Sequence, residues 1–196
     1  DKQITFSPSS QIKRAFEKAK NSSVFVKMVI LIIPVSIFSM GIQNFIPAFI
    51  VQERGLSQGF GNLFYVIFMA LGIGGKTIAG EAFDRKGFQW TFLSQIGFGL
   101  LGLFLFSQIP GFWAVALGIF LVAPPRGGIY TAMHSNLLEN TASGSVDLLY
   151  GLFMVSLTVF GAIGPSLVGT LIDNIGFRWS FSVLLVVLFT TLPIVF

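Results

Sequence analysis

Residues 80–92, GEAFDRKGFQWTF, return at residues 169–181 as GTLIDNIGFRWSF. Both stretches keep a Gly, an Asp four residues later, a Gly-Phe pair and a Trp, and all matched positions lie 89 residues apart (169 − 80 = 89). The same offset pairs Gly75 with Gly164. So many coincidences of Gly, Asp and Trp at one offset indicate an internal repeat.

Long apolar runs surround both copies of the repeat. A membrane-spanning helix needs about 20 mostly apolar residues, because the hydrocarbon core is about 30 Å thick and a helix rises about 1.5 Å per residue. The runs are continuously apolar and lack the period-two alternation of barrel strands, so they predict helices. The six predicted helices are 24–51, 60–79, 88–107, 112–133, 148–172 and 177–196, with connectors that include 81–87, 135–147 and 173–176.

The repeat predicts how these helices are organised. The offset of 89 residues contains three predicted helices, so the second copy enters the membrane from the side opposite to the first. The predicted fold class is therefore an all-α membrane protein with six transmembrane helices in a 3+3 inverted repeat, an architecture typical of transporters. Residues 1–23 are predicted to be a cytoplasmic linker with a short basic amphipathic segment, and residues 24–196 form the transmembrane domain.

The composition excludes most soluble classes of protein. Of the 196 residues 54% are apolar and only 10% are charged, whereas a soluble domain carries about 25% charged residues. The chain has no Cys and one His, which excludes disulfide frameworks and His- or Cys-based metal clusters, and no metal or cofactor is predicted. The net charge of +4 does not indicate nucleic acid, because the basic residues follow the membrane topology.

The distribution of Lys and Arg predicts the orientation. Basic residues are retained on the cytoplasmic side of short loops. With the N-terminus inside, nine of them lie on the cytoplasmic side and two, Arg54 and Arg178, lie outside. We therefore expect a multi-pass protein of the plasma membrane whose N-terminal end is cytoplasmic. Because the chain begins at Asp1 and ends within an apolar run, we also expect it to be a piece of a longer protein.

Residues 75–87, GKTIAGEAFDRKG, resemble the cytoplasmic signature loop of the major facilitator superfamily, Gly-Arg/Lys-x-x-x-Gly-x-x-x-Asp-Arg-x-Gly. The resemblance extends over about 24–196 and is to the C-terminal six-helix half of the family. It implies two six-helix halves with substrate between them during alternating access. The implied partners are a missing N-terminal six-helix half, the lipid bilayer, a small-molecule substrate and a coupling ion, either a proton or a counter-substrate.

The same resemblance implies a conformational latch. In the family the signature loop pairs with groups of the other half, which by position assigns that pairing to Asp84 and Arg85. After Gly87 the sequence departs from the fuller pattern, because Phe88-Gln89 replaces the usual basic residues. The latch residues are Gly75, Lys76, Gly80, Asp84, Arg85 and Gly87, and the outer copy of the latch contains Gly169, Asp173 and Gly176.

Three polar residues inside the predicted helices are candidates for substrate binding. Arg126 follows a tandem proline within the fourth helix, where an ionised group normally faces protein or water and suits an anionic substrate. The alternative is that Arg126 snorkels to the interface or pairs with a structural carboxylate. Gln43 and Asn44 lie about 100° apart near the middle of the first helix, so one is expected to face substrate and the other a neighbouring helix.

These observations predict a secondary transporter of a small organic solute, with an organic anion favoured by Arg126. No predicted helix contains Asp or Glu, so a coupling carboxylate would have to lie in the other half. An enzyme is not expected, since the sequence has neither a Gly-x-Ser-x-Gly elbow nor a second His. The alternatives are efflux of drugs or metabolites by the same fold and, from another class, a membrane-embedded enzyme or a solute sensor.

Overall fold

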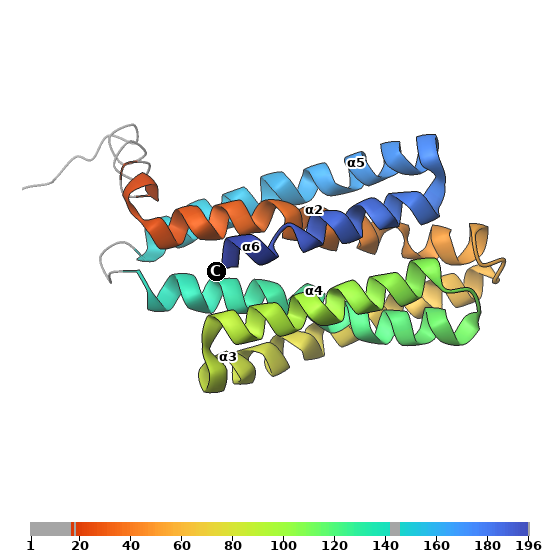
Figure 1. Cartoon of the computed structure of the whole chain (residues 1–196), viewed down its shortest axis with the longest axis horizontal. Coiled ribbons are helices and arrows are strands. Elements are labelled where there is room, and N and C mark those ends of the chain that lie inside the picture. The colour runs from red at the N-terminus through yellow and green to blue at the C-terminus, as the bar shows by residue number, and fades with distance from the viewer. Residues whose placement is uncertain (1–16, 18, 142–145, 196) are drawn as a thin grey trace, which may run out of the picture.

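The computed structural model describes residues 17, 19–141 and 146–195, and every regular element in this part of the chain is a helix (Figure 1). The prediction of an all-α fold is therefore confirmed. The greater part of the predicted basic linker lies outside the described residues. The helices are α2 (Ser23–Gln52), α3 (Gln58–Gln108), α4 (Phe112–Glu139), α5 (Val146–Phe189) and α6 (Leu192–Val195).

Helix α2 shows how the local sequence starts and interrupts these helices. The Ser22 hydroxyl caps the first turn by accepting a hydrogen bond from the Phe25 amide at 3.2 Å. Pro34 and Pro47 lie inside the helix, and each removes one amide donor from its hydrogen-bond ladder. After Gln52 the chain turns through Gly55, which has a φ of 66° and so suits glycine.

Helices α3 and α5 each contain one residue outside the helical conformation, Gly87 (φ 75°) and Gly176 (φ 76°). The chain reverses direction at both points, so each helix consists of two segments that run side by side (Figure 1). A residue with a side chain pays about 1–2 kcal/mol in this left-handed conformation, whereas glycine does not. The predicted connectors at 81–87 and 173–176 are therefore wrong in one respect: the helix continues up to each glycine, because a single left-handed residue is enough to turn the chain.

Two further predicted boundaries are wrong. Helix α4 continues to Glu139, which shortens the predicted connector 135–147. The last predicted helix, 177–196, is broken at Thr190 and Thr191, where the structure has a turn. Their hydroxyls donate to the Val187 and Leu188 carbonyls at 2.6 and 2.7 Å, and such local bonds compete with the helix ladder.

Close backbone contacts pair the helices. Gly75, in the first segment of α3, lies against the backbone of Pro124 in α4, and a Cβ added at Gly75 would lie 2.5 Å from the Pro124 Cα. Gly164, in the first segment of α5, lies against Ile37 of α2, with a Cβ placed 3.2 Å from the Ile37 Cα. Small residues let membrane helices approach this closely. Helix α4 thus packs on α3, and α2 packs on α5.

A phenylalanine cluster connects α2, α3 and α5 at one end of the bundle. Phe49 lies at its centre, with ring centroids 4.5 Å from Phe106, 5.1 Å from Phe181 and 5.9 Å from Phe177. All four side chains are buried. Tilted and edge-on aromatic contacts of this kind stabilise a core beyond the area they bury, so the cluster fixes α2 between the second segments of α3 and α5.

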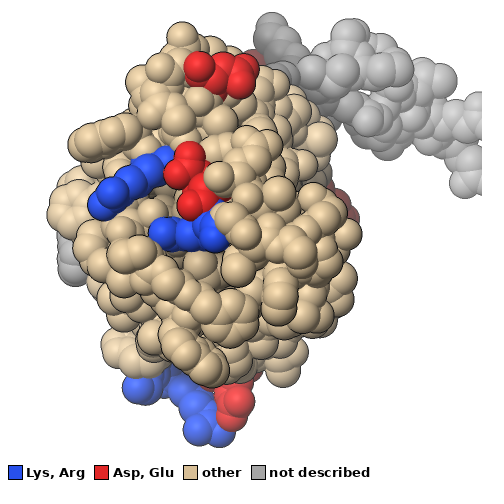
Figure 2. Space-filling view, turned by 90° about the vertical axis from the view of Figure 1, so that its right-hand side faces the viewer, with Lys and Arg blue, Asp and Glu red and all other residues tan. Residues whose placement is uncertain are grey.

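Cations cap the C-terminal end of α3 beside this cluster. Arg54 donates to the Phe106 carbonyl at 2.7 Å, and the Arg178 Nε donates to the Gln108 Oε1 at 3.0 Å. Burial lowers the pKa of the Arg54 guanidinium below its ordinary value, and the charge of the neighbouring Glu53 opposes that shift. Figure 2 shows this end of the molecule, a mainly uncharged face with a group of basic and acidic side chains near its middle, an acidic patch near its top and further basic and acidic side chains at its lower edge.

The outer surface suits a membrane. Large apolar side chains are exposed on it, including Trp113 (81% exposed), Ile73 (70%) and Trp179 (68%). A soluble protein rarely leaves so much apolar area in water. By length and composition, four helices of the described residues can cross a membrane, namely α2, α3, α4 and the run 146–195 that holds α5 and α6. The protein is therefore a multi-pass integral membrane protein.

Candidate functional site

Arg126 lies in the middle of α4, directly after Pro124 and Pro125. The side chain is half-buried and reaches toward α3, where its NH1 lies 3.5 Å from the Met69 Sδ and its Cζ lies 5.7 Å from the centroid of the Phe68 ring. Its Nε is buried and has no hydrogen-bond partner among the described residues. Within that part of the chain no carboxylate forms an ion pair with it. The predicted alternative of a structural salt bridge therefore has no support from these residues.

Several further polar side chains converge around Arg126. The Tyr65 and Tyr130 side chains lie close enough to interact with its charge. Tyr65 accepts a hydrogen bond of 3.4 Å from the Gln43 Nε2, which connects α2 to α3. The Tyr130 hydroxyl approaches Ser36 and Ser39 of α2 without meeting the geometry of a hydrogen bond to either. We call this group the polar cluster; it consists of Ser36, Ser39, Gln43, Tyr65, Arg126 and Tyr130.

The polar cluster contains buried atoms without hydrogen-bond partners. Within the described residues these are the Ser36 and Ser39 hydroxyls, the Gln43 Oε1, the Arg126 Nε and the Tyr130 hydroxyl. A buried polar group left without a partner costs about 1–3 kcal/mol. Native proteins keep few such groups, and a concentration of them marks a place where water, an ion or a ligand supplies the missing bonds.

The chemistry of the polar cluster suits an anion. A guanidinium can donate two parallel hydrogen bonds to a carboxylate or phosphate, and the tyrosine and serine hydroxyls can donate further bonds to the same group. Phe68 and Met69 add an apolar, polarisable wall beside the guanidinium. The arrangement can thus hold a charged group at Arg126 and an apolar body next to it.

The structure brings only two of the three predicted substrate residues together. Gln43 joins Arg126 in the polar cluster through its bond to Tyr65. Asn44 does not, because its side chain is exposed and donates to the Met40 carbonyl of its own helix at 2.8 Å. This agrees with the expectation that adjacent amides face different ways, although Asn44 bonds its own backbone and not a neighbouring helix.

The other members of the polar cluster were not predicted, although the sequence holds a signal for most of them. Tyr130 lies four residues after Arg126, so the two share a face of α4. Ser36, Ser39 and Gln43 are spaced by three and four residues and share a face of α2. Tyr65 has no such relation to the others, because its place depends on how α3 packs on α2.

The predicted latch divides into two parts. Gly75 lies against α4, and the stem of Lys76 lies beside Gly127 of the same helix. Nearer the reversal of α3, Arg85 donates to Glu81 at 2.6 Å, and these side chains are 73% and 63% exposed. Exposed pairs of this kind add little to stability.

The remaining latch residues lie at or near the reversal of α3. Gly80 has open space where a Cβ would stand, and Gly87 forms the reversal. Asp84 is exposed and forms no ion pair within the described residues.

The outer copy of the latch lies in the same way around the reversal of α5. Gly169 lies near the Phe45 ring, with an added Cβ 3.3 Å from its Cζ, and Gly176 forms the reversal. Asp173 is exposed and, like Asp84, forms no ion pair within the described residues. The two copies therefore place an Asp three residues before each left-handed glycine, at opposite ends of the bundle (Figure 1).

Comparisons with known proteins agree with this fold. The MFS-type transporter eupM from Phoma sp is 30% identical over 108 residues, which are 55% of this chain and 38% of that protein. The crystal structure of the POT family transporter PepTSo superposes with a TM-score of 0.74 at 14% sequence identity, covering 88% of this chain and 36% of that one. This chain thus spans less than half the length of both proteins. The sequence profile of the Major Facilitator Superfamily matches residues 28–196. Since this match covers most of its length, the chain belongs to the Major Facilitator Superfamily.

Proposed function

We propose that this chain is a six-helix half of a secondary transporter that moves a small organic solute by alternating access and binds an anionic group of that solute at Arg126. Membership of the Major Facilitator Superfamily supports transport as the activity. The observation that carries the choice of solute is the Arg126 guanidinium, which lies among unpaired buried polar atoms and forms no ion pair within the described residues.

The packing of the glycines supports the 3+3 inverted repeat. Gly75 and Gly164 are 89 residues apart, and their backbone contacts, Pro124 and Ile37, are 87 residues apart. Each pair thus joins the second helix of one repeat to the first helix of the other. The reversal of α3 leaves two segments, 58–86 and 88–108, that are each long enough to cross a bilayer, and the first segment of α5, 146–175, is long enough as well. The second segment of α5, 177–189, is shorter and approaches this length only together with α6. Counted with α2 and α4, the proposal has six spans, the last of which contains the turn at Thr190 and Thr191.

In this proposal the chain acts together with a second six-helix unit. Asp84 and Arg85 would hold that unit in one of the two transport states, since both side chains are exposed at the reversal of α3. The distribution of Lys and Arg supports a cytoplasmic location for this end, and a plasma membrane location fits uptake of a solute from outside. A proton or a counter-substrate would supply the driving force.

The test is uptake of labelled mono- and dicarboxylates by proteoliposomes that contain the full-length protein. Arg126→Gln is expected to lower uptake at least about tenfold, because it removes a charge-assisted contact. Arg126→Lys, which keeps the charge but loses the paired donors, should retain part of the activity. Arg178→Gln is the matched control, since it removes one Arg charge outside the polar cluster.

The outcomes separate the alternatives. If Arg126→Gln transports as well as the unaltered protein, Arg126 does not bind the solute. If carboxylates are not carried but cells lacking the protein become sensitive to hydrophobic cations, the protein is an efflux transporter. Ligand binding without flux would indicate a solute sensor.

A further inference from the structure

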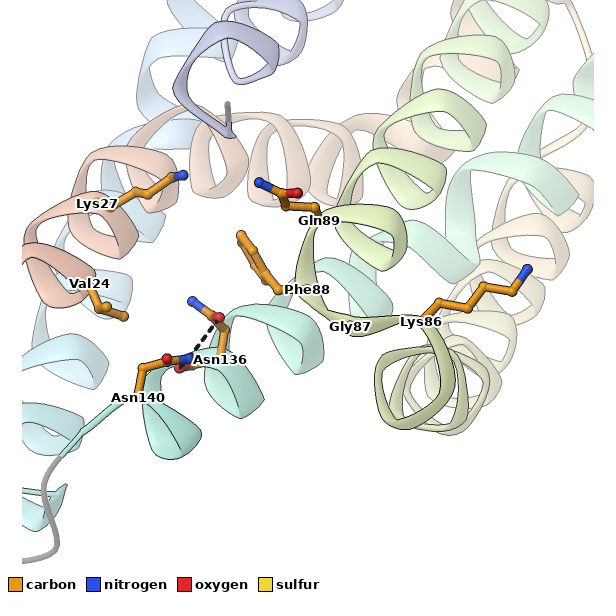
Figure 3. A pocket seen from close by; sticks show the side chains of 8 residues that line it. All are labelled: Val24, Lys27, Lys86, Gly87, Phe88, Gln89, Asn136 and Asn140. Carbon is orange, nitrogen blue, oxygen red and sulfur yellow. Dashed lines mark hydrogen bonds between the residues drawn. The ribbon is translucent and has the colours of Figure 1, made fainter.

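A pocket lies at the reversal of α3, away from the polar cluster. It has a volume of about 390 Å³ and opens where the start of α2, the reversal of α3 and the end of α4 meet (Figure 3). Its polar lining consists mainly of the Lys27 ammonium and the amides of Gln89, Asn136 and Asn140, while Val24 and Phe88 give it an apolar side. Among the described residues, none of those that line it carries a carboxylate.

The Lys27 ammonium supplies the positive charge. It donates one hydrogen bond to the Val195 carbonyl at 2.6 Å, and an ammonium has two further protons to donate. In Figure 3 it points across the mouth of the pocket toward Gln89. Lys86 also borders the pocket, but its ammonium points away and lies 3.7 Å from the centroid of the Trp90 ring.

The two asparagines are oriented by their own hydrogen bonds. The Asn140 Nδ2 donates to the Asn136 carbonyl at 2.9 Å and to the Asn136 Oδ1 at 3.2 Å. Because the Asn136 Oδ1 accepts the second bond, the Nδ2 of the same amide lies on the side away from Asn140. The Asn136 Nδ2 contacts the Met28 Sδ at 3.8 Å, a weak acceptor, and therefore remains able to donate to a ligand.

The backbone adds donors of its own. The second segment of α3 starts after Gly87, so its first amide groups have no carbonyl acceptors within the helix. Phe88 and Gln89 belong to this first turn and line the pocket. The N-terminal end of a helix also carries the positive end of the helix dipole. Ammonium, amide and backbone donors thus surround a space large enough for a small polar group.

From these donors we infer that the pocket binds a phosphate group, carried either by the headgroup of a phospholipid or by a soluble phosphate compound. A phosphate oxygen accepts several hydrogen bonds at once, and Phe88 and Val24 fit the glycerol part or the first methylenes of a lipid. The pocket lies at one end of the bundle, and helices that span a bilayer end near its headgroups. This inference does not depend on the proposed transport function.

The experiment measures the melting temperature of the full-length protein in a maltoside detergent, which carries no phosphate, with and without added phosphatidylglycerol. A second arm titrates glycerol 3-phosphate into the detergent-solubilised protein. Lys27→Gln is expected to lower the apparent affinity about tenfold, the effect of one charge-assisted hydrogen bond. Lys27→Arg should restore most of it. Lys86→Gln is the matched control, because it removes one Lys charge from the same end of the bundle without removing a donor from the pocket.

Each outcome decides the inference. Stabilisation by phosphatidylglycerol that is lost in Lys27→Gln and kept in Lys86→Gln supports a lipid headgroup, and the same pattern with glycerol 3-phosphate alone supports a soluble phosphate. If neither ligand stabilises the unaltered protein, the inference is wrong. It is also wrong if both substitutions reduce the stabilisation equally, because the effect would then come from general surface charge.

Discussion

Replacing Gly75 by alanine is expected to push α3 and α4 apart. The added Cβ would lie 2.5 Å from the Pro124 Cα and would overlap the Pro124 carbonyl, which are backbone atoms that no side-chain rotation can move. Carbon atoms reach favourable contact at about 3.5 Å, so the two helices would have to separate by about 1 Å. Overpacking of this kind typically costs about 1–3 kcal/mol of the free energy of unfolding.

Gly74 and Gly164 provide matched controls. Gly74 has nothing within 4 Å of an added Cβ, so Gly74→Ala gains only the helix propensity of alanine, about 1 kcal/mol at most. At Gly164 the Cβ would lie 3.2 Å from the Ile37 Cα, about 0.3 Å inside favourable contact, which a small shift relieves. The expected order of stability is Gly74→Ala, then Gly164→Ala, then Gly75→Ala.

The assay is thermal unfolding of the purified variants in one detergent. A difference of about 1 kcal/mol moves the midpoint by about 2–4 °C in a chain of this length. Gly75→Ala should therefore melt at least about 4 °C below Gly74→Ala. If the two variants melt at the same temperature, the backbones of α3 and α4 do not approach closely at Gly75. The packing of Gly75 and Gly164 would then no longer support the inverted repeat.

Three other substitutions test separate parts of the structure. Gly87→Ala places a side chain at a φ of 75° and should destabilise the protein by about 1–2 kcal/mol in the same melting assay, unlike Gly97→Ala, where space is open. Arg54→Gln removes the bond to the Phe106 carbonyl and should destabilise it by about 1 kcal/mol, and an unchanged midpoint would show that this cap is dispensable. Tyr65→Phe should raise the KM for a transported anion several-fold and, because it also removes the bond from Gln43, destabilise the protein by about 1 kcal/mol; an unchanged KM would exclude this hydroxyl from solute binding.

The sequence by itself determined the helical class, the membrane setting and most of the places where the chain turns, the turn at Thr190 and Thr191 excepted. Hydrophobicity and length are local properties, so apolar runs predict spanning helices without knowledge of their neighbours. Gly87 and Gly176 mark reversals because only glycine readily adopts a positive φ. The predicted helix ends before these glycines were too early, because each turn consists of a single residue. The helix continues to Lys86 and to Ile175, since the polar residues before each glycine are also compatible with a helix.

Only the tertiary structure decided which polar side chains meet. Gln43 and Asn44 are neighbours in sequence with the same chemistry, yet Gln43 bonds Tyr65 while Asn44 bonds its own helix. The difference arises from the rotation of α2 against α3, which is set by close packing of side chains along both helices. The phosphate pocket has the same origin, because Lys27 and Asn136 are far apart in the chain and face one pocket only after α2 and α4 have packed against the reversal of α3. Contacts between helices depend on how the helices are rotated and shifted relative to one another. The sequence pattern within a single helix determines neither the rotation nor the shift.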